Sequence, residues 1–153
     1  MTDEPVMDEK QLAARLFNGV WTLLEKEDRS LADDELMIHM AHASCYHWGQ
    51  VGTPTNAVRG EWQCARVYAT VRRAEPALYH ARRSLELCLE NGIGDFDVAF
   101  CYEALARAHA VAGEWEQVQT WLDRAETALQ DVADAEDRQL VQSDLDTVPR
   151  PPP

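Results

Sequence analysis

The sequence has very little lysine and no excess of positive charge. Its 153 residues include 14 lysines and arginines, of which only Lys10 and Lys26 are lysines, against 27 aspartates and glutamates, so the formal net charge is -13. Nucleic acids and anionic membrane surfaces are bound by basic patches. The charge balance therefore argues against nucleic acid and membranes as partners.

Long apolar runs and known catalytic motifs are also missing. No stretch approaches the roughly 18 apolar residues that cross a bilayer, and no signal peptide opens the chain, which predicts a cytoplasmic protein. The scarcity of lysine beside abundant alanine, aspartate and glutamate favours a bacterial source. GxSxG, P-loop and GxGxxG patterns are absent, so no common catalytic class is indicated.

Closely spaced cysteines are absent as well. The four cysteines, Cys45, Cys64, Cys88 and Cys101, form no CxxC pair, which excludes a zinc ribbon or a thioredoxin-like motif. We expect free thiols that pack as small hydrophobic residues.

What the sequence does contain is helical periodicity. Apolar residues recur at a spacing of three and four, and no segment alternates as a strand would. Seven helices are predicted, at residues 8–27, 34–49, 55–72, about 76–90, 95–112, 114–132 and 134–148. We expect Asp33 or Asp34 to cap the second helix and Thr53 or Thr55 the third. The remaining ends, residues 1–7 and 149–153, are predicted to be a flexible acidic N-terminus and a disordered proline-rich tail around a single domain, 8–148.

The helices repeat at intervals of 40 to 41 residues. Residues 65–85 align with 106–126 at a shift of 41, which places Arg66 opposite Arg107, and residues 39–52 align with 79–92 at a shift of 40. Small residues fall on small residues: Ala41 on Ala81, Ser44 on Ser84, and Ala65 on Ala106. Small residues at matching positions are expected where two helices cross closely, and a fixed period of this length is typical of helical repeats.

The segment YEALARAHAVAGEWEQVQTWLDRA, residues 102–125, resembles the tetratricopeptide repeat (TPR) family. The matching residues are Leu105, Ala106, His109 in the usual tyrosine position, Gly113, Trp115 and Ala125. A weaker match covers residues 65–85, where Arg72 replaces the turn glycine. The resemblance implies an all-α superhelix of about seven antiparallel helices, arranged as three TPR-like hairpins and a C-terminal capping helix. The alternative is a helical bundle without repeats.

The same resemblance implies a concave groove that binds a partner. Its residues would be Arg59, Trp62, Arg66, Phe100, Glu103 and Arg107. Arg66 and Arg107 would lie side by side, and two guanidiniums suit a carboxylate or phosphate. In the alternative interpretation they form salt bridges with Glu61, Glu103 and their neighbours. The predicted function is a protein- or peptide-interaction module that binds an acidic or carboxylate-bearing partner without a cofactor, and that could also form a homodimer.

A rival hypothesis starts from the stretch HMAHASCYHW, residues 39–48. His39 and His42 share a helix face, but His47 is rotated by about 140° from His42, so this helix alone cannot join all three. Partners on other helices could complete a site for a divalent transition metal, from His39, His42, His47, Glu61 and His109. The same residues with Tyr68 and Tyr102 could instead line the pocket of an enzyme or a small-molecule-binding protein, between the second, third and fifth helices.

Overall fold

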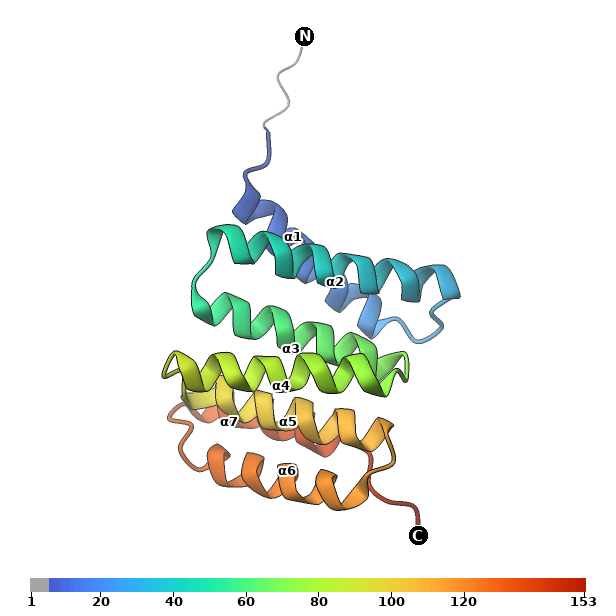
Figure 1. Ribbon diagram of the computed structural model, residues 1–153, viewed down its shortest axis with the longest axis vertical. Helices are drawn as coiled ribbons and strands as arrows, with labels where there is room; N and C mark the ends of the chain where they lie inside the picture. The colour runs from blue at the N-terminus through green and yellow to red at the C-terminus, as the bar shows by residue number, and fades with distance from the viewer. Residues whose placement is uncertain (1–5) are drawn as a thin grey trace.

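Seven α-helices and no strand make up residues 6–153, the part of the chain that this computed structural model describes (Figure 1). They are α1 (Glu9–Glu25), α2 (Leu31–Val51), α3 (Pro54–Thr70), α4 (Ala74–Glu90), α5 (Asp95–Val111), α6 (Trp115–Leu129) and α7 (Ala135–Asp146). The prediction of an all-α chain with seven helices is confirmed. The predicted flexible N-terminus falls mostly on residues 1–5, which lie outside the described residues, and residues 149–153 carry no helix and are exposed.

α1, α2 and α7 begin at short polar residues whose side chains accept a hydrogen bond from the backbone N–H of the third helical residue. Thr53 caps α3 as predicted. The prediction for α2 is wrong, because the cap is Ser30 rather than Asp33 or Asp34, and the helix begins three residues earlier than expected. The backbone N–H of Asp33 donates to the Ser30 hydroxyl (3.1 Å), and the N–H of Ser30 donates to the Asp33 carboxylate (3.0 Å). Asp33 is therefore the third helical residue of a capping box, in which side chain and backbone bond reciprocally.

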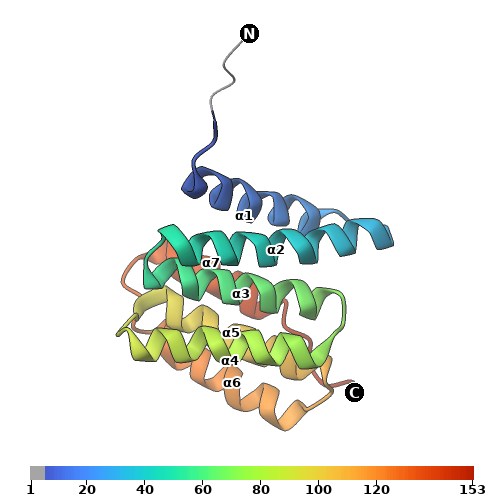
Figure 2. The same ribbon diagram turned by 45° about the horizontal axis from the view of Figure 1, so that its top comes forward.

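The first six helices form three antiparallel hairpins, α1–α2, α3–α4 and α5–α6, which stack in chain order (Figures 1 and 2). α3 packs against both α1 and α5, whereas the backbones of α2, α4 and α6 do not lie close to one another. Within the described residues, the odd-numbered helices thus line the inner side of the stack. The turn after α5 places Gly113 in the left-handed region (φ 73°), and Arg72 adopts the same conformation (φ 64°) after α3. Arg72 therefore occupies the turn position that favours glycine.

Small residues at matching positions of the repeat are buried. The six aligned residues are all between 0% and 2% exposed: Ala41, Ala81, Ser44, Ser84, Ala65 and Ala106. The two serine hydroxyls donate to backbone carbonyls, that of Ser44 to Ala13 of α1 (3.0 Å) and that of Ser84 to Ala81 within α4 (2.7 Å). The repeat alignment thus pairs positions that are buried in both repeats.

The last helix folds back onto the inner side of the stack. α7 packs mainly on α5 and less on α6, and Figures 1 and 2 both show it behind the layer of hairpins. Its apolar residues Val141 and Leu145 are 0% and 2% exposed. α7 therefore narrows the inner face instead of adding a further layer to the end of the stack.

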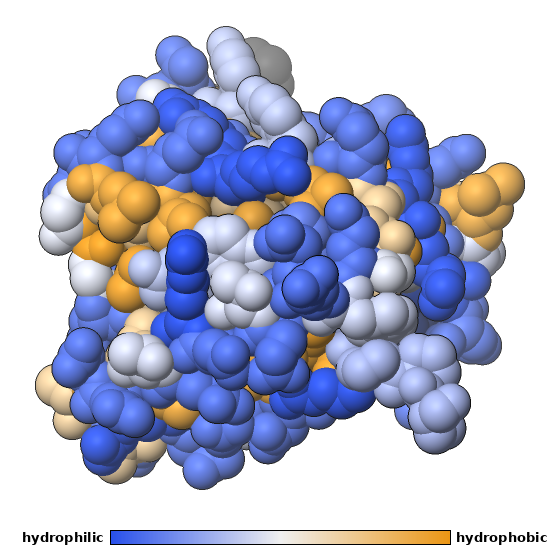
Figure 3. Space-filling model, turned by 60° about the horizontal axis from the view of Figure 1, so that its bottom comes forward, coloured by the Kyte–Doolittle hydropathy of each residue, from blue (hydrophilic) through white to orange (hydrophobic). Residues whose placement is uncertain are grey.

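Figure 3 shows one face on which hydrophilic side chains surround separate hydrophobic areas. No helix in residues 6–153 is long and apolar enough to cross a membrane.

Candidate functional site

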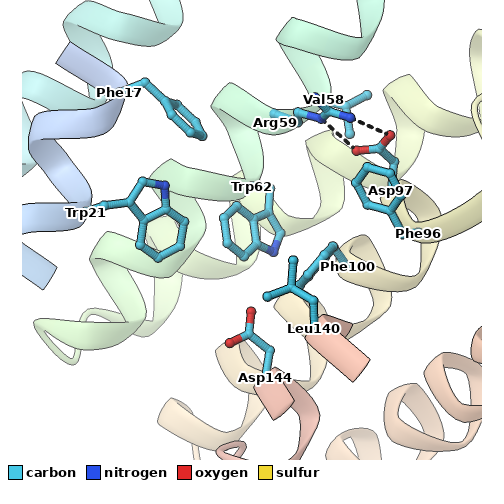
Figure 4. Close-up of a pocket in the computed structure, with 10 residues that line it drawn as sticks. All are labelled: Phe17, Trp21, Val58, Arg59, Trp62, Phe96, Asp97, Phe100, Leu140 and Asp144. Carbon is cyan, nitrogen blue, oxygen red and sulfur yellow. Dashed lines mark hydrogen bonds and ion pairs between the residues drawn. The ribbon is translucent and has the colours of Figure 1, made fainter. Parts of the chain in front are cut away.

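A cavity of about 410 Å³ opens on the inner side of the stack, between α1, α3, α5 and α7 (Figure 4). Each helix contributes two residues that are four apart, because residues at this spacing lie on one helix face. These pairs are Phe17 and Trp21, Val58 and Trp62, Phe96 and Phe100, and Leu140 and Asp144; Arg59 and Asp97 complete the lining. We call this cavity the aromatic pocket.

Aromatic rings form the walls of the pocket. The Trp62 ring lies 5.4 Å from the Trp21 ring and 5.4 Å from the Phe100 ring, measured between centroids. Phe17 and Phe96 extend the series at each end, with centroids 6.4 Å from Trp21 and 6.2 Å from Phe100. Figure 4 shows the Trp21 and Trp62 rings side by side. Such ring contacts fix the pocket walls, since edge-to-face and offset pairs are favourable arrangements.

An ion pair between Arg59 and Asp97 stands at one edge of the pocket. Nε and Nη2 of Arg59 donate to the two carboxylate oxygens of Asp97, at 3.0 and 3.2 Å (Figure 4). The guanidinium also lies 5.2 Å from the centre of the Phe96 ring. The Arg59 side chain is 45% exposed, against 11% for Asp97. The Nη1 group of Arg59 therefore remains available at the edge that faces solvent.

Glu103 is the centre of a buried network behind Trp62. Its carboxylate is 0% exposed and accepts three hydrogen bonds, from Trp62 Nε1 (3.1 Å), Arg66 Nη1 (3.4 Å) and Arg107 Nε (2.7 Å). A buried charge is tolerated only when it is paired and hydrogen-bonded. The network therefore holds α3 against α5 and fixes the Trp62 indole that forms the pocket wall.

α7 closes this network from the other side. Arg66 lies 3.6 Å from the Asp144 carboxylate, and Arg107 donates to the Asp144 carbonyl (3.0 Å) and the Thr147 hydroxyl (2.6 Å). Burial raises the pKa of Asp144, and the Arg66 charge opposes that shift. Two guanidiniums and two carboxylates thus face each other between α3, α5 and α7.

All six residues predicted for the groove lie in or directly behind the aromatic pocket. Arg59, Trp62 and Phe100 line it, and Glu103, Arg66 and Arg107 form the network behind it. The two arginines form salt bridges, as in the alternative interpretation of the sequence, because both pair with Glu103. Arg66 and Arg107 are thus next to each other, as the repeat alignment predicts.

The sequence prediction of the groove missed the other lining residues, which are Phe17, Trp21, Val58, Phe96, Asp97, Leu140 and Asp144. The spacing of four between Phe17 and Trp21, and between Phe96 and Phe100, is a sequence signal for a shared helix face. Nothing in the local sequence could have revealed Leu140 and Asp144, because their position depends on where α7 folds.

The predicted histidine site does not come together as one group. His47 pairs with Glu9 of α1 (3.1 Å), His109 lies 3.3 Å from Glu114, and His39 is exposed. No group of three or more His, Cys, Asp or Glu side chains within residues 6–153 could hold a metal ion. Tyr102 stacks on Trp121 of α6. The expected pocket between the second, third and fifth helices is thus not formed by these residues.

Part of the set does meet, between α2, α3 and α4. His42 Nε2 lies 2.7 Å from the Tyr68 hydroxyl, and His80 Nδ1 lies 2.6 Å from the Glu61 carboxylate. The His42 and His80 rings are 5.2 Å apart. Burial and the neighbouring His80 lower the pKa of His42. This cluster shares no residue with the lining of the aromatic pocket, so it is a separate feature.

Comparison of the chain with protein-family models, curated proteins and solved structures finds no match. The resemblance to tetratricopeptide repeats therefore rests on the sequence pattern alone. Any function must be argued from the geometry of the aromatic pocket and its surroundings.

Proposed function

We propose that the chain is a protein- or peptide-interaction module whose inner face takes up an apolar side chain of a partner. The observation that carries this proposal is the aromatic pocket itself, about 410 Å³ in volume and walled by five aromatic side chains. Stacked helical hairpins create extended inner surfaces that suit peptide segments. Pockets of this size and apolar character anchor one large side chain or a small molecule.

A carboxylate next to that side chain would be recognised by Arg59. Two of its nitrogens are bonded to Asp97, and the side chain is 45% exposed, so Nη1 can donate to an incoming carboxylate. Arg66 and Arg107 already bond Glu103 and residues of α7. The partner of this proposal is therefore a segment with an apolar residue beside a carboxylate, such as an apolar C-terminal residue.

The proposal also includes the location of the module and its possible self-association. We place it in the bacterial cytoplasm, and its four cysteines are free thiols. A second copy of the chain is one acceptable partner, provided that it presents such a segment. No cofactor is required for this mode of binding.

Peptide libraries with an apolar C-terminal residue, made with a free carboxylate or with a terminal amide, test the proposal. Binding is read from tryptophan emission, since Trp21 and Trp62 line the pocket. The variant Leu140→Trp fills the mouth of the pocket, where Leu140 is 58% exposed. The matched control is Leu89→Trp on α4, where the leucine is 66% exposed away from the pocket. We expect the first variant to abolish binding and the control to bind normally; equal binding by both would contradict the proposal.

Arg59 is tested separately with Arg59→Gln. Because one charge-assisted hydrogen bond is lost, the affinity for peptides with a free carboxylate should fall by roughly tenfold or more. The affinity for the amidated peptides should stay unchanged. Arg124→Gln is the control, because Arg124 stacks on Trp121 of α6, outside the aromatic pocket. If both peptide series lose affinity equally, Arg59 does not recognise the peptide carboxylate.

A small-molecule-binding role is the second candidate, because the pocket volume also suits a small apolar ligand. Native mass spectrometry with elemental analysis of the purified protein separates the two. A stoichiometric bound molecule or metal would favour the second candidate. Protein that carries none and binds the peptides would favour the first.

A further inference from the structure

Two buried thiols face each other where the second hairpin meets the third. Sγ of Cys88, in the last turn of α4, lies 3.5 Å from Sγ of Cys101, in the second turn of α5. Both residues are 0% exposed, and both are free thiols. The two helices are joined by the short connection at residues 91–94, where Gly92 is in the left-handed region (φ 63°). The pair is therefore held together by the packing of adjacent elements.

We propose that Cys88 and Cys101 are a redox-active pair that forms a disulfide between α4 and α5 when the protein meets a peroxide. A disulfide has an S–S length of about 2.05 Å, so the sulfurs must approach by about 1.5 Å. Both lie within two turns of the α4–α5 connection, where helix ends open most readily. A small oxidant such as hydrogen peroxide can enter through such openings, whereas bulky thiol reagents are excluded.

Either sulfur can donate its S–H to the other across this contact. The contact with Cys101 lowers the pKa of Cys88, whereas the contact with Cys88 and burial raise the pKa of Cys101. The thiolate is the nucleophile in such reactions. Whichever thiol ionises attacks the oxidant, and the facing thiol, 3.5 Å away, resolves the oxidised intermediate. The steps are the same with Cys88 or Cys101 as the attacking residue.

The reaction balances with one peroxide. The Cys88 thiolate attacks one peroxide oxygen; the S–O bond forms, the O–O bond breaks, and the hydroxide that leaves takes up the proton released from the Cys88 thiol to become water. Cys101 then attacks the Cys88 sulfenic sulfur; the S–S bond forms, the S–O bond breaks, and the second hydroxide takes the Cys101 proton. Two thiols lose two electrons and two protons, and hydrogen peroxide is reduced to two waters.

The other two cysteines provide an internal control. Cys45 Sγ donates to the Glu61 carboxylate at 3.8 Å, whereas the sulfurs of Cys88 and Cys101 face each other. The contact with Cys45 and burial raise the pKa of Cys64. We expect neither Cys45 nor Cys64 to form the disulfide that links Cys88 and Cys101.

Peptide mapping of the full-length protein tests the proposal directly. The tryptic peptide of residues 84–107 contains Cys88 and Cys101 but neither of the other cysteines. After treatment with stoichiometric hydrogen peroxide, unfolding and alkylation, this peptide should be two hydrogens lighter and remain unalkylated, and dithiothreitol added before the alkylation should reverse both changes. Cleavage after Glu90 should leave two fragments joined by the disulfide.

Thermal unfolding supplies a second readout. A cross-link across so short a segment should raise Tm by roughly 5–10 °C in the oxidised protein. The double variant Cys45→Ser/Cys64→Ser should keep the shift, whereas Cys88→Ser should lose it. Full alkylation of both thiols in residues 84–107 after peroxide, or a disulfide that includes Cys45 or Cys64, would overturn the proposal.

Discussion

The buried carboxylate of Glu103 is expected to be the most sensitive single position outside the apolar core. We consider Glu103→Gln, which keeps the size of the side chain and removes its charge. The amide oxygen of the new side chain could still accept one hydrogen bond, from Trp62 or from Arg107. Arg66 and Arg107 would lose the carboxylate that they share at 3.4 and 2.7 Å.

The expected loss of stability in Glu103→Gln follows from the burial of the two guanidiniums. Removing one partner of a fully buried ion pair costs about 3–5 kcal/mol. The Arg66 and Arg107 side chains are 18% and 12% exposed, and both keep contacts to α7, so the cost is reduced. We expect the free energy of unfolding to fall by about 2–4 kcal/mol, which corresponds to a Tm drop of roughly 5–15 °C.

Urea unfolding followed by circular dichroism and by tryptophan emission measures this loss. The matched control is Glu86→Gln, which breaks the ion pair between Glu86 and Arg83 (3.1 Å) on the exposed side of α4, where the Glu86 side chain is 59% exposed. Exposed pairs contribute little, so the control should change stability by less than about 0.5 kcal/mol. If both variants lose the same small amount, Glu103 does not neutralise the two arginines as the geometry indicates.

Three further changes test separate features of the fold. Arg72→Gly should stabilise the protein by about 1 kcal/mol in urea unfolding, because glycine adopts the left-handed conformation without the steric cost. Gly60→Ala should destabilise it by about 1–3 kcal/mol by the same measurement, since the added Cβ would lie 3.1 Å from Cys45 Sγ. The hydrogen bond from Lys26 lowers the pKa of Asp33 to about 2, so the folded state binds this proton less readily than the unfolded state. The stability difference between the native chain and Asp33→Asn should therefore be complete above about pH 4 and disappear as the pH falls through about 2, as measured by unfolding at each pH.

The number and order of the helices could be predicted because their signals are local. Helical spacing, capping residues and turn glycines act over a few residues. The repeat alignment adds that residues at matching positions should pack in the same way in each repeat. The match of Ser44 with Ser84 predicted two positions that are both fully buried. The cap of α2 was mispredicted because Ser30 and Asp33 both have good capping chemistry, and only the backbone decides which one stands outside the helix.

The composition of the pocket depends on contacts between distant segments. The resemblance to tetratricopeptide repeats implied that α3 and α5 line the groove, and Trp62 and Phe100 were predicted on that basis. α7 has no counterpart in the repeat, so its fold onto α5, which brings Asp144 within 3.6 Å of Arg66, had no sequence signal. For the same reason the sequence leaves open whether Arg66 and Arg107 bind a ligand or form salt bridges, since nothing in it places their partners on α7.

In the proposed binding mode, the pairing of these charges limits which residues of the inner face can recognise a partner. Glu103 and Asp144 belong to the same chain as Arg66 and Arg107, so they are already in place, whereas a separate ligand must give up translational freedom to replace them. Charge at these two arginines therefore supplies little affinity. Arg59 differs because its side chain is 45% exposed and one guanidinium nitrogen is not bonded to Asp97. Most of the affinity should then come from filling the aromatic pocket, and the preference for a free carboxylate from Arg59. Leu140→Trp should therefore remove binding, whereas Arg59→Gln should change which peptides are bound.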